Sequence, residues 1–367
     1  MAWLPALLPA ACASGQAAPA PATLPAATRA ATTRPATLTF RGCHILDPLT
    51  RDQHGRSFAI RGLSGITYDA STNALWAVMD NSDKLVRIDA AIAAEDGALV
   101  FARPASGVTL QHKRDFEGIS AAGNRGGSVF LSEEDGPGVH EYRLRDGRRV
   151  RSLPTPEVFL RGRTVGNRGF ESLSLSPDGR TLWTANEHAL TVDGSARTPV
   201  EPIGATTRVR LLRYALDPAT GEANPSAQFV YQTSGVHELA GFNSLSDLVA
   251  LPDGRLLALE RSGGKNLVQR ASIRTRIFLV ETQRATDVSG PPFDRGLADQ
   301  QYAPVRKTLL FDGFVCDADG ENLEGLCLGP RLGRGRWAVI GVVDDGDGPL
   351  RVSRSRVVSF ELRLGGD

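Results

Sequence analysis

The sequence is poor in cysteine, methionine and aromatic residues, and its charges nearly cancel. Among 367 residues there are 4 Cys, 2 Met and 6% aromatic residues, while 42 basic and 41 acidic side chains leave a net charge of +1. This balance excludes bulk electrostatic attraction to nucleic acid. Beyond the N-terminal stretch, no segment has the roughly 20 apolar residues that a membrane-spanning helix needs. G-x-S-x-G, H-E-x-x-H, P-loop and dinucleotide-binding motifs are also missing, so a serine esterase mechanism has no support in the sequence.

Glycine and proline, in contrast, are abundant. The 39 Gly and 22 Pro predict many turns, and the short alternating runs between them predict strands. Hydrophobic residues make up 41% of the chain, which is enough for a core. The length would ordinarily favour two domains, but closed all-β folds can exceed the usual limit as one domain. We therefore expect an all-β protein.

The N-terminal segment predicts export. Residues 1–12 are apolar and resemble the end of a bacterial lipoprotein signal, with Cys12 as the acylated residue. An ordinary signal peptide cleaved between Ala11 and Ser14 is the alternative. Residues 13–36 are almost entirely Ala, Pro and Thr and form an extended tether. We expect residues 1–36 to lie outside the fold, residues 37–367 to form one domain, and the protein to be periplasmic, anchored to the cell envelope by lipid, or secreted.

Three cysteines remain if Cys12 is lipidated or removed. Cys316 and Cys327 flank a short loop that a disulfide could close in an oxidising compartment. We expect a Cys316–Cys327 disulfide; the alternative is that these two and Cys43 are all buried thiols.

A repeated pattern organises the chain. Each unit has an opening strand, a turn, a second strand and a third strand of alternating apolar and charged residues, and most have a fainter fourth strand. The spacing is comparable to propeller blades of roughly 40–50 residues with added loops. The opening strands begin Ser64-Gly-Ile-Thr-Tyr, Glu117-Gly-Ile-Ser, Glu171-Ser-Leu-Ser-Leu, Ser246-Asp-Leu-Val-Ala and Glu324-Gly-Leu-Cys-Leu.

The pattern predicts a β-propeller of five blades, or six if residues 188–245 or 262–320 contain a further blade. The last unit lacks a fourth strand, and the strand at residues 36–43 has no place in the other units. We therefore expect the N-terminal strand to complete the last blade, which would leave no exposed sheet edge. An open β-sandwich would explain the alternation but not the fivefold order of parts.

Acidic residues recur where opening strands begin and second strands end, so they should meet at one mouth of the central channel. Converging carboxylates repel one another unless they are protonated, paired or neutralised by a cation. The alternative is that they are ordinary loop acids, solvated or paired with Arg114, Arg168 and Arg261. The expected ring comprises Ser64, Asp80, Asn81, Glu117, Glu133, Glu134, Asp135, Glu171, Asn186, Glu187, Asp247, Glu260, Arg261, Glu324, Asp344, Asp345 and Asp347.

Oxygen ligands without thiolates favour Ca²⁺, or Mg²⁺, over zinc or copper. We expect the metal to be held by Glu117, Glu171, Asn186, Glu187 and Glu324. Glu133 or Asp344 would act as general base in catalysis. Arg168, His188 and Arg261 would bind an anionic substrate.

Three stretches carry a family resemblance. Arg114-Asp-Phe-Glu-Gly-Ile-Ser120, Gly169-Phe-Glu-Ser-Leu-Ser174 with Leu182-Trp-Thr-Ala-Asn-Glu187, and Glu321-Asn-Leu-Glu-Gly-Leu326 are similar to the bacterial phytase-like family, also called esterase-like activity of phytase. The resemblance covers most of residues 55–362 and implies a propeller fold, export, and hydrolysis of phosphate or other esters. A second similarity, to the sugar-lactonase propellers, implies lactone hydrolysis, and a non-catalytic binding propeller in the envelope is a further alternative. We expect a monomer that binds a small anionic or ester substrate and no nucleic acid.

Overall fold

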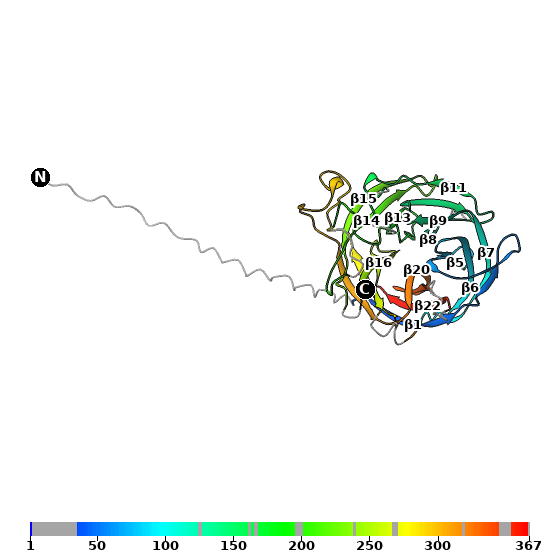
Figure 1. Cartoon of the computed structure of the whole chain (residues 1–367). Coiled ribbons are helices and arrows are strands. Elements are labelled where there is room, and N and C mark those ends of the chain that lie inside the picture. The colour runs from blue at the N-terminus through cyan, green and yellow to red at the C-terminus, as the bar shows by residue number, and fades with distance from the viewer. Residues whose placement is uncertain are drawn as a thin grey trace.

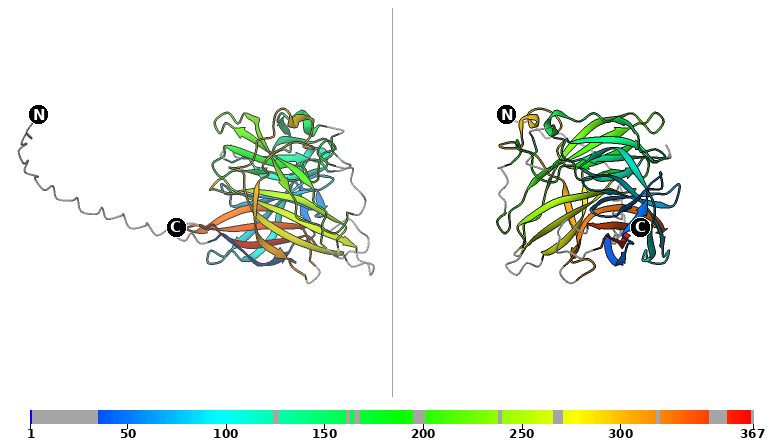
Figure 2. Two further views of the ribbon diagram at one scale, coloured as in Figure 1. Left: turned by 90° about the vertical axis from the view of Figure 1, so that its left-hand side faces the viewer. Right: turned by 45° about the vertical axis from the view of Figure 1, so that its right-hand side comes forward.

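The computed structural model describes Met1 and residues 35–365, apart from 124–126, 161–162, 165–167, 195–200, 238–239, 266–270, 318–319 and 345–353. Within these residues the chain forms five antiparallel sheets of four strands and one sheet of two strands. Figure 1 shows the larger sheets arranged around a central axis, and Figure 2 shows the same assembly from two further sides. This is a β-propeller of five blades, so the predicted fold class is confirmed and the six-blade alternative is not.

The first two blades follow the predicted order from the channel outwards. Blade 1 consists of β4 (Leu63–Asp69), β5 (Ala74–Met79), β6 (Ser82–Ile92) and β7 (Leu99–Arg114). Blade 2 consists of β8 (Phe116–Ala121), β9 (Ser128–Glu133), β10 (Gly138–Arg143) and β11 (Arg149–Ser152). The two-stranded sheet, β2 (Leu49–Arg51) with β3 (Ser57–Ala59), contacts β7 at the rim.

The next two blades include the long stretches in which a sixth blade could have lain. Blade 3 consists of β12 (Ser174–Leu175), β13 (Thr181–Ala185), β14 (Arg208–Leu216) and β15 (Ala223–Gln232). Blade 4 consists of β16 (Phe242–Ala250), β17 (Leu256–Lys265), β18 (Ala271–Glu281) and β19 (Arg306–Gly313). The described connections include the short 3₁₀ turns η2 (Glu157–Phe159), after blade 2, and η3 (Phe293–Arg295), between β18 and β19.

Blade 5 is completed by the N-terminal strand, as predicted. It consists of β20 (Asn322–Gly333), β21 (Arg336–Asp344), β22 (Arg356–Arg363) and β1 (Thr37–Ile45), with Thr37 paired to Arg363. The inner strands β4, β8, β12, β16 and β20 contact one another in turn and close the ring.

The hydrophobic core is divided among the blade interfaces. Five of the clusters of buried apolar side chains each join two neighbouring blades. Alternate residues of a strand therefore pack in different interfaces, as Leu131 does towards blade 1 and Phe130 towards blade 3. Because both faces of a blade are buried, the blades have apolar residues on both sides, and the polar residues gather at the strand ends.

The opening motifs share a backbone irregularity that exposes their acids to the channel. The pairing of inner and second strands shifts register between Leu63 and Ile66, and equivalent shifts occur in β8, β16 and β20. The inner strands also approach closely here: a Cβ at Gly65 would lie 2.4 Å from the Glu117 carbonyl oxygen. Bulges re-aim side chains, so the residue just before this glycine position can face the channel mouth.

The cysteine prediction is wrong. A disulfide joins Cys43 to Cys316, with 5.7 Å between their Cα atoms, and Cys327 is a buried free thiol. Cys327 packs in the interface between blades 5 and 1. Cys43 lies on β1, which contacts β19, the strand that precedes the Cys316 loop. No helix among the described residues is long and apolar enough to cross a membrane.

Candidate functional site

The propeller brings the predicted acids to one mouth of the channel from several blades. Glu117 and Glu171 come from the opening motifs of blades 2 and 3, and Glu324 comes from that of blade 5. Asp80, Glu134 and Glu187 directly follow or closely follow second strands, where antiparallel pairing returns the chain to the same edge. We call this arrangement the acid ring.

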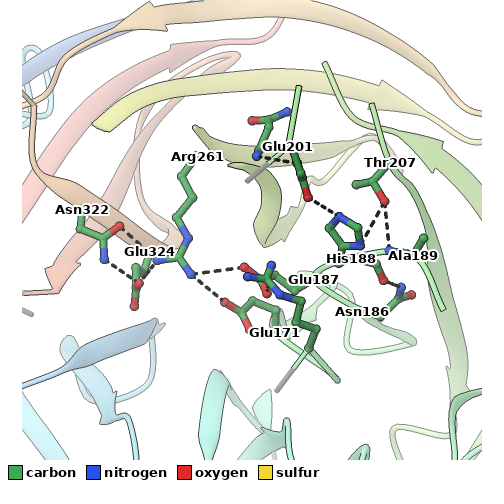
Figure 3. A network of polar contacts seen from close by, with 12 residues as sticks. Glu171, Asn186, Glu187, His188, Ala189, Glu201, Thr207, Arg261, Asn322 and Glu324 are labelled. Atoms are coloured by element: carbon green, nitrogen blue, oxygen red, sulfur yellow. Dashed lines mark hydrogen bonds and ion pairs between the residues drawn. The ribbon is translucent and has the colours of Figure 1, made fainter. Parts of the chain in front are cut away.

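One part of the acid ring is organised by Arg261, which lies on the second strand of blade 4 (Figure 3). Its guanidinium contacts the Glu324 carboxylate and lies 3.4 Å from Glu171 Oε1 and 3.5 Å from Glu187 Oε1. It also donates to Asn322 Oδ1 at 3.1 Å. The side chain is only 15% exposed. Burial lowers the pKa of Arg261, but the surrounding carboxylates more than reverse this and raise it above its usual value.

A second arginine supports the same part of the acid ring. Arg168 Nη1 lies 2.6 Å from Glu187 Oε2, so Glu187 is placed between two guanidinium groups. Asp344 is connected through Asn322, whose amide nitrogen lies 2.7 Å from Glu324 Oε1 and 3.1 Å from Asp344 Oδ2. The two arginines could therefore hold an anionic group as well as the carboxylates.

The other part of the acid ring has several carboxylates in close proximity. Asp80, Asp115 and Glu117 form one group of three, and Glu117, Glu134 and Glu171 form another; in each group, one oxygen per residue lies within 4.8 Å of the others. Glu117 belongs to both groups.

Burial and mutual repulsion dominate the electrostatics of these acids. Burial, followed by the Glu171 charge, raises the pKa of Glu134 to about 11. Burial and a hydrogen bond with Asp115 raise the pKa of Asp80 to about 7. The pKa values of Glu117 and Glu171 are also raised well above their usual range, first by burial and then by neighbouring carboxylates. A nearby divalent cation would reverse this preference for the protonated forms.

The donor set fits a hard divalent cation. All the candidate ligands are carboxylate oxygens, which calcium and magnesium prefer. Asp115 Oδ1 is a buried atom without a hydrogen-bond partner, and Asp115 belongs to the first group of three. A buried polar atom left without a partner carries a free-energy cost, which coordination to a cation would remove.

Several predicted site residues lie elsewhere. Asn186 donates to the His188 carbonyl oxygen and accepts from the Arg210 N–H at 2.9 Å, so its amide supports the backbone. His188 Nε2 is 2.8 Å from Glu201 Oε1. Glu133 contacts Arg114 and His140. Asp345 and Asp347 lie outside the described residues.

Two other ring predictions also need revision. Asp247 lies one residue farther along its strand, at the position of Gly65, and accepts from the N–H groups of Leu248 and Leu326 at 2.8 and 2.6 Å. Glu260 accepts hydrogen bonds from Tyr231 of blade 3 and from Asn243 and Lys307 of blade 4, so its carboxylate is paired between these two blades.

Three acids of the carboxylate groups were absent from the predicted ligand set. Asp80 and Glu134 were expected in the acid ring but were not chosen as ligands, and Asp115 was not selected at all. The signal for Asp80 and Glu134 was their place after the second strands of blades 1 and 2, equivalent to that of Glu187 in blade 3. The only sequence signal for Asp115 was its position close to Glu117, in the stretch that carries the family resemblance.

Comparisons with known proteins were made at the level of sequence and of structure. A sequence search of curated proteins gave no match. Structural similarity extends to an endo-arabinase from Bacteroides thetaiotaomicron VPI-5482, with 11% identity, a TM-score of 0.41, and coverage of 85% of this chain and 97% of that one. An α-L-arabinofuranosidase from Podospora anserina is 9% identical, with a TM-score of 0.36 and coverage of 89% and 98%.

The sequence profile of a family described as "Phytase-like: Esterase-like activity of phytase" matches residues 59–347. The match covers more than three quarters of the 367 residues and all the opening motifs. The chain belongs to this phytase-like family.

Proposed function

We propose that the protein is a hydrolase of phosphate or other ester substrates that depends on a divalent cation and acts at the acid ring. The main support is the pair of carboxylate groups that share Glu117, with oxygens within 4.8 Å in each group. Membership of the phytase-like family supports the ester substrate class. The proposed ligands are Asp80, Asp115, Glu117, Glu134 and Glu171, in place of a set that included Asn186, Glu187 and Glu324.

The cation proposed for this site is Ca²⁺, with Mg²⁺ as the alternative, because both prefer oxygen ligands. When bound, such a cation polarises an ester oxygen and lowers the pKa of a coordinated water. Arg261 and Arg168, which already contact carboxylates, would orient the anionic oxygens of the substrate. Asp344, which is partly exposed beside Asn322, would accept the proton of the attacking water.

The test combines cation binding with turnover. Thermal stability is measured with CaCl₂, MgCl₂ or EDTA, and hydrolysis of phosphomonoesters, aryl esters and lactones is measured under the same conditions. We expect stabilisation by Ca²⁺ and a chelator-sensitive phosphoesterase activity, both lost in Asp80→Asn/Glu117→Gln. Glu95→Gln removes an exposed acid outside the ring and serves as the matched control.

The other outcomes of this test have distinct meanings. Calcium stabilisation without hydrolysis of any ester would favour a non-catalytic binding propeller. Chelator-sensitive hydrolysis of lactones alone would favour the lactonase alternative. Phosphoesterase activity unchanged in the double variant would contradict the proposal.

We also propose that the protein is an exported monomer, held at the cell envelope by lipid on Cys12. The Cys43–Cys316 disulfide is consistent with an oxidising compartment, whereas Cys12 lies outside the described residues. Cys12→Ser should move the protein from the membrane fraction to the soluble fraction after cell lysis. Sedimentation of the soluble form should give the mass of one chain.

A further inference from the structure

Glu133, which the sequence suggested as a base in the acid ring, belongs to a separate cluster in blade 2. Its carboxylate Oε2 lies 3.0 Å from His140 Nε2, and Arg114 Nη1 donates to its other oxygen at 2.9 Å. On the far side of the imidazole ring, His140 Nδ1 lies 2.8 Å from Ser152 Oγ. The three side chains form a continuous chain from a buried acid through an imidazole to a hydroxyl.

The sheet fixes this arrangement. Ser152 on β11 is directly opposite His140 on β10, and Glu133 is at the end of β9 opposite Gly138. A Cβ at Gly138 would lie 3.1 Å from His140 Nε2, so the glycine leaves room for the imidazole next to Glu133. The three groups therefore lie on regular strands, which hold side chains more rigidly than loops do.

The solvent exposure of the three side chains increases from the acid through the imidazole to the hydroxyl, as nucleophilic catalysis requires. The Glu133 side chain is 7% exposed and that of His140 is 12% exposed, whereas Ser152 is exposed. Glu133 accepts hydrogen bonds from Arg114 and from His140 Nε2, which leaves the lone pair of Nδ1 for the Ser152 hydroxyl.

A similar cluster in blade 3 shows what a structural version of this arrangement looks like. His188 Nε2 contacts Glu201, and His188 Nδ1 is 3.5 Å from Thr207 Oγ1. Thr207 is buried, and its hydroxyl accepts from the Ala189 N–H at 3.1 Å. That hydroxyl is out of reach of a substrate, whereas Ser152 is on the surface.

We propose that Ser152, His140 and Glu133 form a second hydrolytic site, independent of any cation, that cleaves small activated carboxylic esters such as aryl acetates. Serine, base and acid have their usual roles, although the two ring nitrogens are exchanged relative to the common arrangement. An open strand surface suits esters whose leaving group is already stable, because such esters need less stabilisation of the developing oxyanion.

The reaction balances with water as the only co-reactant. Ser152 Oγ forms a bond to the acyl carbon, and its proton passes to His140 Nδ1. The ester C–O bond then breaks, and the phenol leaves with that proton. Water next attacks the acyl-serine, giving one proton to Nδ1, and the carboxylic acid departs as Oγ regains a proton.

The test uses the full-length protein in EDTA. A fluorophosphonate probe should label Ser152, as identified by peptide mass spectrometry, and 4-nitrophenyl acetate should give a burst of nitrophenol. Ser152→Ala should remove the label, and His140→Ala should slow labelling by at least about 100-fold. The matched control is Ser226→Ala, which removes an exposed serine from the outer strand of blade 3 that contacts Arg213 and no histidine.

Other results would overturn the proposal. They are absence of label on Ser152, equal labelling of the folded His140→Ala variant, or a burst that survives Ser152→Ala. Melting temperatures of all variants show whether they remain folded, and Ser152→Thr keeps a hydroxyl as a second check. Because chelator is present throughout, a failure here is distinct from a failure of the acid-ring phosphoesterase.

Discussion

The two parts of the acid ring both contain buried carboxyl groups, but they differ in how the negative charge is compensated. In the first, which we call the arginine side, Glu187 and Glu324 contact Arg261 or Arg168. In the second, the carboxylate side, Asp80, Asp115, Glu117 and Glu134 lie together. Glu171 belongs to both, because it contacts Arg261 and is part of a carboxylate group.

The difference shows that a ring of acids is not by itself a metal site. An internal guanidinium already satisfies the arginine side, so a cation there would have to displace it. The carboxylate side retains raised pKa values at Asp80, Glu117 and Glu134, which indicate that burial and mutual repulsion outweigh the nearby positive charge. We therefore expect the two sides to respond in opposite ways to substitution.

The largest expected effect is that of Arg261→Met. The substitution removes the positive charge from beside Glu171, Glu187 and Glu324, and leaving buried charges without their partner costs about 3–5 kcal/mol of unfolding free energy. Denaturation by urea measures the loss. Arg261→Lys keeps the charge and should lose less. Unchanged stability of Arg261→Met would mean that the arginine side is not held together by this residue.

A smaller effect is expected on Ca²⁺ affinity, where two matched Glu→Gln substitutions should differ. Glu117→Gln should weaken Ca²⁺ binding by about 100-fold, or roughly 2.7 kcal/mol, because Glu117 belongs to both carboxylate groups. Glu324→Gln should change the affinity by less than about threefold, since Glu324 contacts Arg261 and Asn322 instead. Calorimetric titration with CaCl₂ measures both. Equal losses would restore the ligand set predicted from the sequence, in which Glu324 binds the metal.

The smallest effect is a pH dependence of stability in EDTA. The pKa of Asp80 is raised to about 7 in the folded protein, against 3.8 for the ordinary group. Between these values the folded state binds more protons than the unfolded state, so stability falls as the pH rises. We expect the melting temperature to fall by a few degrees from pH 5 to pH 8, and Asp80→Asn or saturating Ca²⁺ to reduce the fall. A melting temperature that rises over this range would contradict the raised pKa.

The five blades could be predicted because the turn residues, the apolar runs and the repeated opening motif all indicate the same strands. Turns such as Pro177-Asp-Gly179 separate apolar runs, and the same opening motif returns in each blade. The strand at the N-terminus had only one available place once the last blade was seen to be incomplete. Local sequence and overall topology therefore gave the same answer.

The details of the site could not be predicted because adjacent residues enter different environments. Glu133 and Glu134 are neighbours, yet only Glu134 joins a carboxylate group. Both faces of β9 are buried, with Leu131 and Phe130 in different interfaces, so alternation does not identify the residue that faces the channel. Asn186 was predicted as a ligand because its amide oxygen suits a metal, whereas in the structure this amide bonds to the His188 carbonyl oxygen and the Arg210 N–H.

The Cys43–Cys316 disulfide could not be predicted from the sequence because it depends on closure of the propeller ring. Cys43 and Cys316 are separated by 273 residues, and only the return of β1 to blade 5 brings them together. Proximity in the sequence favoured the wrong partner, Cys327, whose side chain is occupied by packing between blades.

The closing strand also decides how the propeller would bear a mechanical load. Thr37 pairs with Arg363, at the end of β22 away from Arg356 and the acid ring, so β1 begins on the face opposite the channel mouth. At that face, a load would be applied through the chain ahead of β1. A pull on it can peel only residues 37–42 from β22 before the Cys43–Cys316 bond takes up the tension. The disulfide then works as a mechanical stop that keeps the fifth blade closed.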